Sequence, residues 1–532
     1  MNFKKKLRRR KKLYKSKTTR SSSSKKRLEL ILNISKQKKD QLISKKRNLL
    51  GIKKKVIQEE ISEEQFQKMV ESIPEITNKL MDIFCSNKLE LVKELKEIVS
   101  LEHKPPFNEI INSGVIKVLV EFLNEDNNLQ LQFETAWILS NIASGTSLQT
   151  KFIVDHETIP IFIRLLNSKS ELVCEQAVWA IGNIAIDCIE YRNYLIVLEV
   201  FPILLNILIN VTNHEFILNI LWTLSNLIRG EPQLDFETIA KAFPIFNNFL
   251  YHKNQKIINS TFWALSYLSI QQTKAIPIIL ELGIIDQILI QLKTKNREIY
   301  IPSIRLLGHI ASGNTEQTQQ ILDIGVLSIF KELLKDDSET IRRETCWVLY
   351  NICSGTQDQI QEVIDNEVVP ILINILKNDK FSVKRMCCYV ISNIVFLGSD
   401  KQRWVVSKQG VLVPLSNMLG IEDIQVIFFT LEAIEKILIL EENYEMEETK
   451  SNYSYLGFIN QFEDIGGLEQ LDYFLTFPNS KIRELVTRII DRFYPISDQD
   501  SDELFSNERI FVKKTVVQNI LENEEIKNLE NN

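Results

Sequence analysis

Glycine and proline are scarce in this sequence. Its 532 residues include 16 glycines and 13 prolines, about half the usual share for a soluble protein. Collagen-like, low-complexity and turn-rich all-β classes are therefore disfavoured. We expect long helices with few breaks.

Long apolar runs, paired cysteines and catalytic motifs are missing as well. No apolar run reaches the ~18 residues of a membrane-spanning helix, and the N-terminus is too basic for a signal peptide, so we expect a soluble intracellular protein. The seven cysteines include no C-x-x-C spacing, which argues against a disulfide framework or a zinc site. The five histidines are dispersed, and the motifs H-E-x-x-H, G-x-x-x-x-G-K-[ST] and G-x-S-x-G do not occur. We therefore expect no enzyme and no cofactor or metal.

Acidic residues are nearly absent from the first 56 positions. That segment has 23 Lys and Arg against Glu29 and Asp40, a net charge of +21, which leaves −26 for the remainder. One interpretation is a solvated tail that touches nucleic acid nonspecifically. The other is that the acidic body attracts its own tethered cationic arm.

A pair of positions four residues apart recurs along the acidic body. Its second member falls at intervals of 41 to 43 residues from Asn141 to Asn393. A helical repeat of this length is typical of an armadillo or HEAT solenoid, so we predict an all-α solenoid whose units stack around one concave groove. The pairs are Trp137/Asn141, Trp179/Asn183, Trp222/Asn226, Trp263/Tyr267, Arg305/His309, Trp347/Asn351 and Tyr389/Asn393. Units are expected to open at Gly114, Gly283, Gly325 and Gly410.

Tryptophan and asparagine four residues apart share one helical face. A tryptophan at helical spacing is most often a core residue. Here Ala136, Ile138 and Leu139 already supply the apolar positions, so the recurring asparagine indicates a face that is not sealed. Asparagine carboxamides can hold a peptide backbone, and indole faces can pack the stems of Lys or Arg at ~0.5–2 kcal/mol each. Asp187, four residues after Asn183, would select an ammonium group.

These residues resemble importin α (karyopherin α), a family of adaptors for nuclear localisation signals. The resemblance extends from about residue 20 to about 495, and its most specific stretches are 137–146 and 175–185. The segment from Lys25 to Asn48 is similar to an importin-β-binding segment. The family likeness implies a right-handed armadillo superhelix of about ten repeats over residues 72–495. A basic segment 1–56 and a linker 57–71 would precede the repeats, and an acidic, disordered tail 496–532 would follow them.

Two peptide sites and an internal competitor follow from this resemblance. The major site would hold one lysine through the Gly145 carbonyl, Thr150 and Asp187, assisted by Gln176. Its complete set is Trp137, Asn141, Gly145, Thr150, Gln176, Trp179, Asn183, Asp187, Trp222 and Asn226. The minor site would be Arg305, Glu344, Trp347, Asn351, Tyr389 and Asn393. The autoinhibitory cluster would be Lys45, Lys46 and Arg47.

The minor site departs from the family pattern at three positions. Tyr389 replaces an expected tryptophan, His309 an expected asparagine, and Met386 an expected glutamate. This groove loses an indole, a carboxamide and a charge, so we expect it to bind more weakly than the major groove.

The resemblance also implies partners and a location. Cargo proteins would bind in the groove, an importin-β-type carrier would take residues 25–47, and an export receptor would contact the C-terminal repeats. The protein would shuttle between cytoplasm and nucleus, without membrane or specific nucleic-acid contacts. The alternative is an armadillo scaffold for signalling or adhesion. Such scaffolds usually line their groove with basic residues, whereas this body carries −26.

Overall fold

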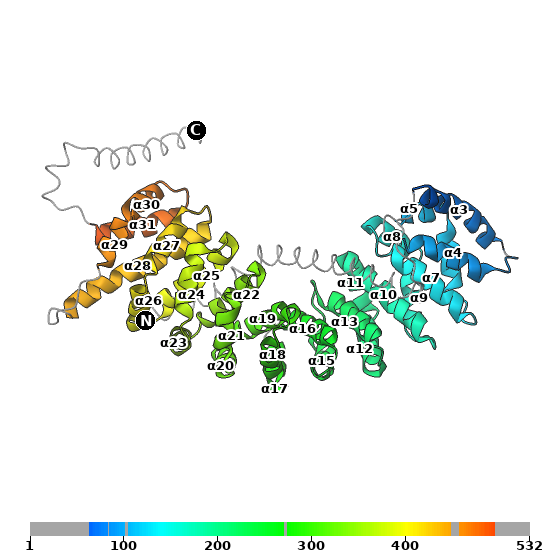
Figure 1. Ribbon diagram of the computed structural model, residues 1–532, viewed down its shortest axis with the longest axis horizontal. Helices are drawn as coiled ribbons and strands as arrows, with labels where there is room; N and C mark the ends of the chain where they lie inside the picture. Colours follow the sequence, from blue (N-terminus) through cyan, green and yellow to red (C-terminus); the bar gives the residue numbers. More distant parts are fainter. Residues whose placement is uncertain (1–62, 83, 102–104, 271–273, 448–456, 495–532) are drawn as a thin grey trace, which may run out of the picture. The chain divides into compact units, whose positions relative to one another are not determined.

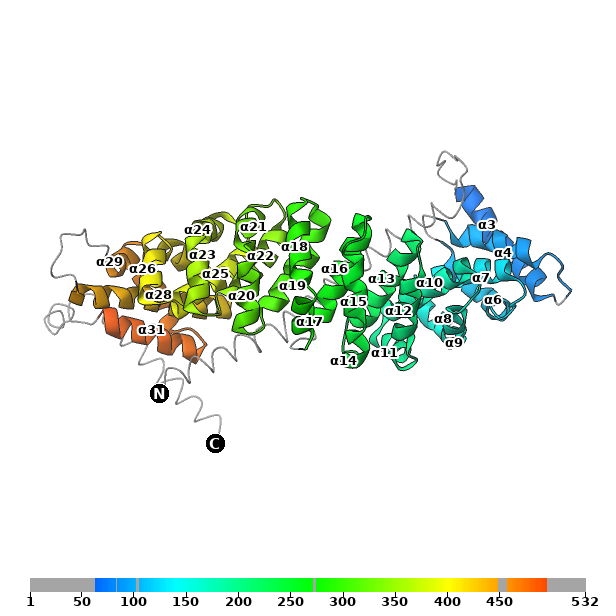
Figure 2. The ribbon, with the colours of Figure 1, turned by 90° about the horizontal axis from the view of Figure 1, so that it is seen from below.

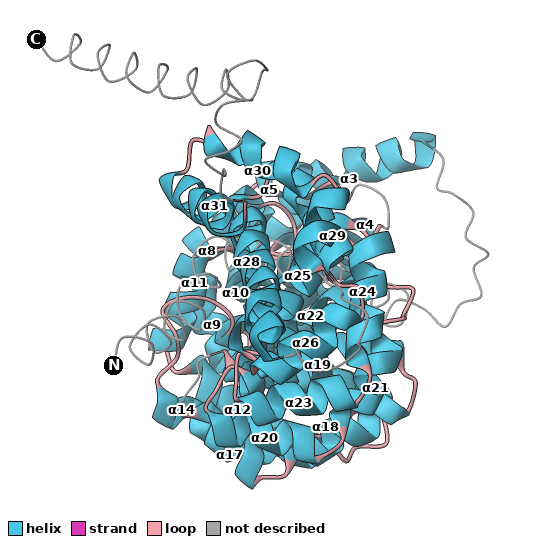
Figure 3. Cartoon of the chain, turned by 90° about the vertical axis from the view of Figure 1, so that its left-hand side faces the viewer, coloured by secondary structure: helices cyan, strands magenta, loops and turns pink. Residues whose placement is uncertain are grey.

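Helices are the only regular elements in the part of the chain that the computed structural model describes. The described residues are 63–82, 84–101, 105–270, 274–447 and 457–494. Within them, α-helices and one 3₁₀-helix are joined by short loops (Figure 3), and the predicted all-α class is confirmed. The basic segment 1–56, with Lys45, Lys46 and Arg47, and the tail 496–532 lie outside these residues.

The chain divides into two compact units, Met1–Gly313 and Asn314–Asn532. In the first unit, a helix pair precedes five groups of three helices (Figure 1). The pair is α3 (Glu63–Met81) and α4 (Lys88–Val99). The groups are α5 (Phe107–Asn112), α6 (Val115–Phe122) and α7 (Leu129–Ile142); α8 (Ser147–Asp155), α9 (Thr158–Leu165) and α10 (Glu171–Asp187); α11 (Ile189–Val197), α12 (Val200–Asn210) and α13 (His214–Ile228); α14 (Phe236–Ala240), α15 (Ala242–Phe249) and α16 (Gln255–Ser269); and α17 (Ala275–Glu281), α18 (Ile284–Lys293) and α19 (Arg297–Ala311).

The second unit continues the pattern with four groups among its described residues. They are α20 (Thr315–Asp323), α21 (Val326–Leu333) and α22 (Glu339–Ile352); α23 (Gln357–Asp365), α24 (Val368–Asn378) and α25 (Phe381–Leu397); α26 (Asp400–Lys408), α27 (Leu412–Ser416) with the 3₁₀-helix η1 (Asn417–Gly420), and α28 (Ile424–Glu447); and α29 (Phe458–Asp464), α30 (Gly467–Leu475) and α31 (Ser480–Phe493).

The first helix starts earlier than the sequence interpretation allowed. The segment 57–71 was expected to be a linker, but α3 begins at Glu63. Phe66, Met69 and Val70 are partly buried, and together with the buried Ile73 they form one face at helical spacing. This apolar face stabilises the helix against the rest of the first repeat.

In most groups the turn between the first and second helices contains a residue with a left-handed backbone; the turn between α14 and α15, at Lys241, is an exception. Gly114, Gly283, Gly325 and Gly410 have φ between 66° and 81°, so the breaks expected at these glycines are confirmed. Glycine adopts this conformation without steric cost. Three other groups place a glutamate there, at Glu157, Glu199 and Glu367, with φ of 54° to 57°.

The third helices form the buried interior of each unit. In the first unit α7, α10, α13, α16 and α19 pack in succession, and in the second α22, α25 and α28 do so. Figure 2 shows α10, α13 and α16 side by side in chain order. In α10 every residue from Val173 to Ile186 is buried, which explains why these helices are apolar on nearly all faces.

Asparagine caps fix where several third helices begin. The side chains of Asn128, Asn213, Asn254 and Asn296 accept hydrogen bonds from backbone N–H groups in the first turns of α7, α13, α16 and α19. Such caps satisfy donors that have no partner within the helix. Because these third helices begin at equivalent residues, the Trp and Asn positions of successive repeats stay aligned.

No single helix among the described residues is long and apolar enough to cross a membrane. Two bent pairs, α11 with α12 and α17 with α18, meet the length and composition requirement only when each pair is taken together.

Candidate functional site

The major-site residues lie on adjacent third helices of the first unit. Trp137 and Asn141 belong to α7, Trp179 and Asn183 to α10, and Trp222 and Asn226 to α13. Because α7 packs on α10 and α10 on α13, the three pairs form a row, which we call the Trp–Asn row. Apart from the half-buried Trp222, these side chains are largely buried.

Two asparagines of the row, Asn183 and Asn226, connect neighbouring repeats. Asn183 Nδ2 donates to the carbonyl of Ser140 at 2.8 Å, and Asn226 Nδ2 donates to that of Gly182 at 3.2 Å. In the second unit Asn393 makes the equivalent bond to Tyr350 at 3.2 Å. Asparagine at this position therefore joins consecutive third helices, a structural role that the sequence interpretation missed.

One half of the Asn183 carboxamide is left for other partners. Its Oδ1 is buried and accepts no hydrogen bond from the described residues. Gln176 Nε2, seven residues earlier on the same helix, is buried and likewise makes none there. A buried acceptor and a buried donor without partners are costly. Asn183 and Gln176 are 0% and 1% exposed, so a peptide backbone pairs with them only after neighbouring side chains of the row have moved.

Two indoles of the row stack on each other. The ring centroids of Trp179 and Trp222 are 5.1 Å apart, with the planes inclined at 30°. An aliphatic stem between two rings needs roughly 7 Å, about twice a carbon–carbon contact, so the space between these two indoles is a closed slot that no lysine stem can enter. Gly182 permits this arrangement, because a Cβ there would lie 2.2 Å from Trp222 Cζ3.

Trp137 is held by α4 and by Ser100, the residue that follows this helix. Its Nε1 donates to Ser100 Oγ at 3.1 Å, and the ammonium of Lys96 lies 5.7 Å from its ring centroid. Asn141 Nδ2 donates to the Trp137 carbonyl at 2.8 Å. Unlike the other asparagines of the row, Asn141 therefore bonds within its own helix.

Asp187 ends α10 beside the start of α8. Its Oδ1 accepts a hydrogen bond from Ser147 Oγ at 3.1 Å, and Ser147 follows the half-buried Gly145 by two residues. Thr150 is fully buried, and its hydroxyl donates to the Ala143 carbonyl at 3.0 Å. In this structure Thr150 orders the loop, whereas the partly exposed Asp187 carboxylate can meet a cation.

A second carboxylate lies in the same row of helices. Glu175 Oε1 on α10 accepts from Asn219 Nδ2 on α13 at 2.5 Å, and both side chains are largely buried. The first unit therefore places two carboxylates, Glu175 and Asp187, at either end of the α10 segment that carries Trp179.

The minor-site residues divide between the two units. Arg305 lies on α19 in the first unit, with its guanidinium carbon 5.5 Å from the Trp263 ring centroid. Glu344, Trp347 and Asn351 lie on α22, and Tyr389 and Asn393 on α25, in the second. The two helices of the second unit pack together, so those five residues share one row.

Two of the three replacements expected to weaken the minor site, Tyr389 and His309, have partners of their own. Tyr389 OH accepts from Arg385 Nε at 3.1 Å, and Arg385 Nε also lies 3.2 Å from Asp423 Oδ2. Burial raises the pKa of Tyr389 to about 12, although the guanidinium of Arg385 opposes this shift. His309 Nδ1 lies 2.7 Å from Ser269 Oγ.

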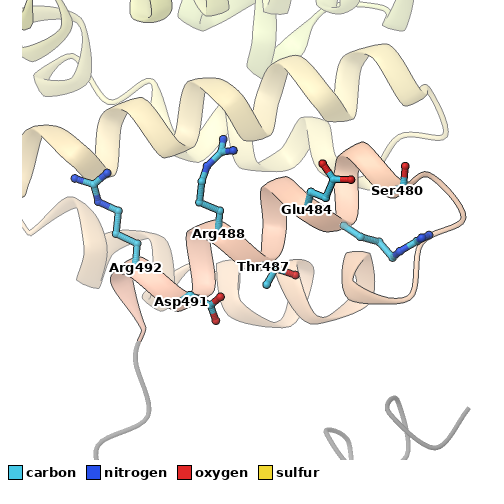
Figure 4. Close-up of a pocket in the computed structure, with 7 residues that line it drawn as sticks. Ser480, Glu484, Thr487, Arg488, Asp491 and Arg492 are labelled. Atoms are coloured by element: carbon cyan, nitrogen blue, oxygen red, sulfur yellow. The ribbon is translucent and has the colours of Figure 1, made fainter. Parts of the chain in front are cut away.

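Helix α31, the third helix of the last group, has a charged depression on its surface. It is lined by Ser480, Arg483, Glu484, Thr487, Arg488, Asp491 and Arg492 (Figure 4). Arg488 Nε and Nη2 lie 2.5 and 2.8 Å from the two carboxylate oxygens of Glu435 on α28. This bidentate pair fastens α31 to the preceding repeat.

Comparison with known proteins finds a matching repeat model and several similar proteins. The armadillo/beta-catenin-like repeat model matches residues 103–144, 146–186, 314–354 and 356–396. Importin subunit alpha-6 of Arabidopsis thaliana is 40% identical over 201 residues, 38% of this chain and 37% of that protein. Importin subunit alpha-1b of Oryza sativa subsp. japonica is 35% identical over 239 residues, 45% of each chain. Importin subunit alpha-3 of Arabidopsis thaliana is 32% identical over 277 residues, 52% of each chain. The chain thus spans about half or less of the length of these relatives.

A solved structure supports the fold independently. The crystal structure of an engineered protein matches with a TM-score of 0.68 and covers 79% of this chain and 98% of its own length. The two sequences are 23% identical, so the match shows a common fold alone. The predicted armadillo solenoid is confirmed.

Proposed function

We propose that this chain is a member of the importin α family and a nonenzymatic nuclear import adaptor, which its armadillo repeats and its similarity to importin α subunits support. It binds lysine- and arginine-rich nuclear localisation signals of cargo proteins in the Trp–Asn row of its first unit. Its basic N-terminal segment, residues 25–47, links the cargo to an importin-β-type carrier. It shuttles between cytoplasm and nucleus, and an export receptor contacts its C-terminal repeats.

The arrangement on α10 is the observation that carries the proposal. Trp179 lies between Glu175 and Asp187 along this helix, with Asn183 Oδ1 and Gln176 Nε2 unpaired among the described residues. A lysine-rich peptide supplies an ammonium group for the partly exposed Asp187 carboxylate and backbone groups for the two amides. Stacking with the stem of a lysine adds to this.

The Trp179–Trp222 stack defines how the peptide meets the indoles. With the slot between these rings closed, a lysine stem contacts their outer faces and edges unless the rings separate on binding. The stack holds both indoles in place before a peptide binds, which lowers the ordering cost of binding. Trp222 is the more accessible of the two, because Trp179 is only 3% exposed.

The net charge of the chain favours this function over the scaffold alternative. Outside residues 1–56 the net charge is −26, which attracts a basic signal and repels the acidic ligands of a basic groove. The same charge favours docking of the chain's own Lys45, Lys46 and Arg47 until a carrier removes them.

Fluorescence anisotropy with a labelled lysine-rich peptide tests the proposal. We expect saturable binding to the full chain, weakened by Trp222→Ala and by rising salt, and no binding of a matched peptide with glutamate in place of lysine. Binding of the glutamate peptide instead would support the scaffold alternative and refute the adaptor.

A further inference from the structure

The Trp–Asn row has a counterpart in the first repeat that contains neither tryptophan nor asparagine. Lys96 and Ser100 precede Trp137 and Asn141 by 41 residues each, which is the repeat interval. Lys96 lies on α4, which packs directly against α7. The position of the indole is therefore taken by a lysine, and that of the carboxamide by a serine.

Lys96 makes contacts that a bound lysine would make. Its Nζ lies 5.7 Å from the ring centroids of both Trp137 and Phe133. The same atom is 2.5 Å from Glu134 Oε2, and the side chains of Lys96 and Glu134 are only 20% and 4% exposed. An indole face, a phenyl face and a carboxylate together form a lysine-binding site, and the chain fills it itself.

Ser100 holds the edge of the same indole. Its Oγ accepts the hydrogen bond from Trp137 Nε1 at 3.1 Å. Lys96 and Ser100 thus fix both a face and the N–H group of Trp137, and the orientation of this ring depends on α4.

A second cation, further along the unit, stands at the repeat position that holds tryptophan in other repeats. Arg305 stands 42 residues after Trp263, and its guanidinium carbon lies 5.5 Å from that ring's centroid. At this one repeat position the first unit therefore carries Lys96, then the four tryptophans 137, 179, 222 and 263, and then Arg305.

We propose that Lys96 is a built-in occupant of the terminal lysine site and sets where the basic cluster of a bound peptide must end. This inference rests on the proposed function. A ligand lysine at that end meets a ring face already covered, a carboxylate already neutralised and an ammonium of like charge. The first unit therefore selects peptides whose residue at this end is not basic.

Substitution of Lys96 tests the proposal, because the variant should bind a peptide with an additional lysine more tightly. Lys96→Met removes the ammonium from Glu134 Oε2 and leaves this carboxylate with only the hydrogen bond that Gln130 Nε2 donates to Oε1 at 2.6 Å. The site then has no cation and is open to a ligand lysine. Lys96→Arg keeps a cation in place. Lys93→Met is the matched control, because Lys93 is on the same helix and pairs with the exposed Glu90 instead.

The parent probe is a peptide with four consecutive lysines flanked by glycines. Each derivative carries a fifth lysine, placed one, two or three residues beyond one end of the cluster. We expect Lys96→Met to bind at least one derivative about threefold to thirtyfold more tightly than the parent peptide, the factor given by one cation–π contact. Wild type, Lys96→Arg and Lys93→Met should gain less than about twofold.

Two results would overturn the inference in different ways. If Lys96→Met and Lys93→Met show the same preference across all peptides, Lys96 is only a structural ion pair, while parent binding that Trp222→Ala weakens still supports the adaptor. If wild type does not bind the parent peptide at all, the proposed function fails and the inference fails with it. Thermal melts verify that Lys96→Met is folded, and Lys96→Gln repeats the measurement if it is not.

Discussion

Ser147 Oγ donates a hydrogen bond to Oδ1 of Asp187 across 3.1 Å, joining the start of α8 to the end of α10. The carboxylate therefore lies near the N-terminal end of α8, whose dipole stabilises an anion. The remaining oxygen, Oδ2, makes no hydrogen bond or ion pair with the described residues. Asp187 is thus oriented by the fold and still able to accept from a cation.

Reversing this charge should abolish peptide binding. In Asp187→Lys, a lysine that has surrendered its hydration meets a like charge in place of its partner, a loss of about 2–5 kcal/mol. Because Asp187 is partly exposed at a helix end, the thermal midpoint should stay within a few degrees. Anisotropy titration of a lysine-rich peptide measures the effect, with Asp155→Lys on α8 as the control of equal charge. Unchanged affinity would remove Asp187 from the site.

The two grooves should contribute unequally. The first unit has three complete Trp–Asn pairs, whereas in the second Tyr389 replaces an indole and is engaged by Arg385. Trp179→Ala should therefore weaken a peptide with a single basic cluster far more than Trp347→Ala does. Both indoles are buried, so each substitution also costs stability, and binding is compared below the melting onset of each variant. Equal losses, or the reverse order, would show that the second unit binds as well as the first.

Removing the basic arm should tighten cargo binding. Tethering places Lys45, Lys46 and Arg47 at an effective concentration of order millimolar, so apparent affinity falls by the fraction of sites left open. Deleting residues 1–56, or changing the three residues to alanine, should lower the dissociation constant of a lysine-rich peptide and make it insensitive to added carrier. Carrier and cargo should bind the full chain with positive, reciprocal coupling. Equal affinity of the full and truncated chains at physiological salt would mean that the arm serves the carrier alone.

Asn183 should stabilise the solenoid as well as bind peptide. Asn183→Ala removes the hydrogen bond to the Ser140 carbonyl, at a cost of about 0.5–1.5 kcal/mol in the free energy of unfolding. Urea denaturation measures this, with the exposed Asn206→Ala on α12 as the control. If both substitutions leave stability equal, the inter-repeat bond contributes nothing and Asn183 acts on the ligand alone.

Tyr389 should make stability depend on pH in the alkaline range. Burial raises its pKa to about 12 in the folded chain, against about 10 for an unperturbed tyrosine. Between these values the unfolded state releases the phenolic proton and the folded state retains it, so stability falls as pH rises from about 10 to about 12. Tyr389→Phe should show a smaller fall over this interval than wild type in parallel chemical denaturation. Superimposable pH profiles would contradict this.

The sequence alone determined the repeat and the candidate row. An interval of 41 to 43 residues is a local periodicity, and positions four apart share a helix face whatever the neighbours do. The left-handed turns at Gly114 and Gly325 were predictable for the same reason, because only a few residues on either side govern them. The charge division at residue 56 needs no structure at all.

Only the tertiary structure decided what the row's side chains contact. The Trp179–Trp222 stack, the bond from Asn183 to Ser140 and the placement of Lys96 over Trp137 all join residues about 40 positions apart. The repeat interval already placed Lys96 at the position that holds tryptophan in the following repeats, yet a lysine there could equally have pointed into solvent. Its position depends on how closely α4 packs on α7, and packing between repeats is set by the fit of many side chains together rather than by any local pattern.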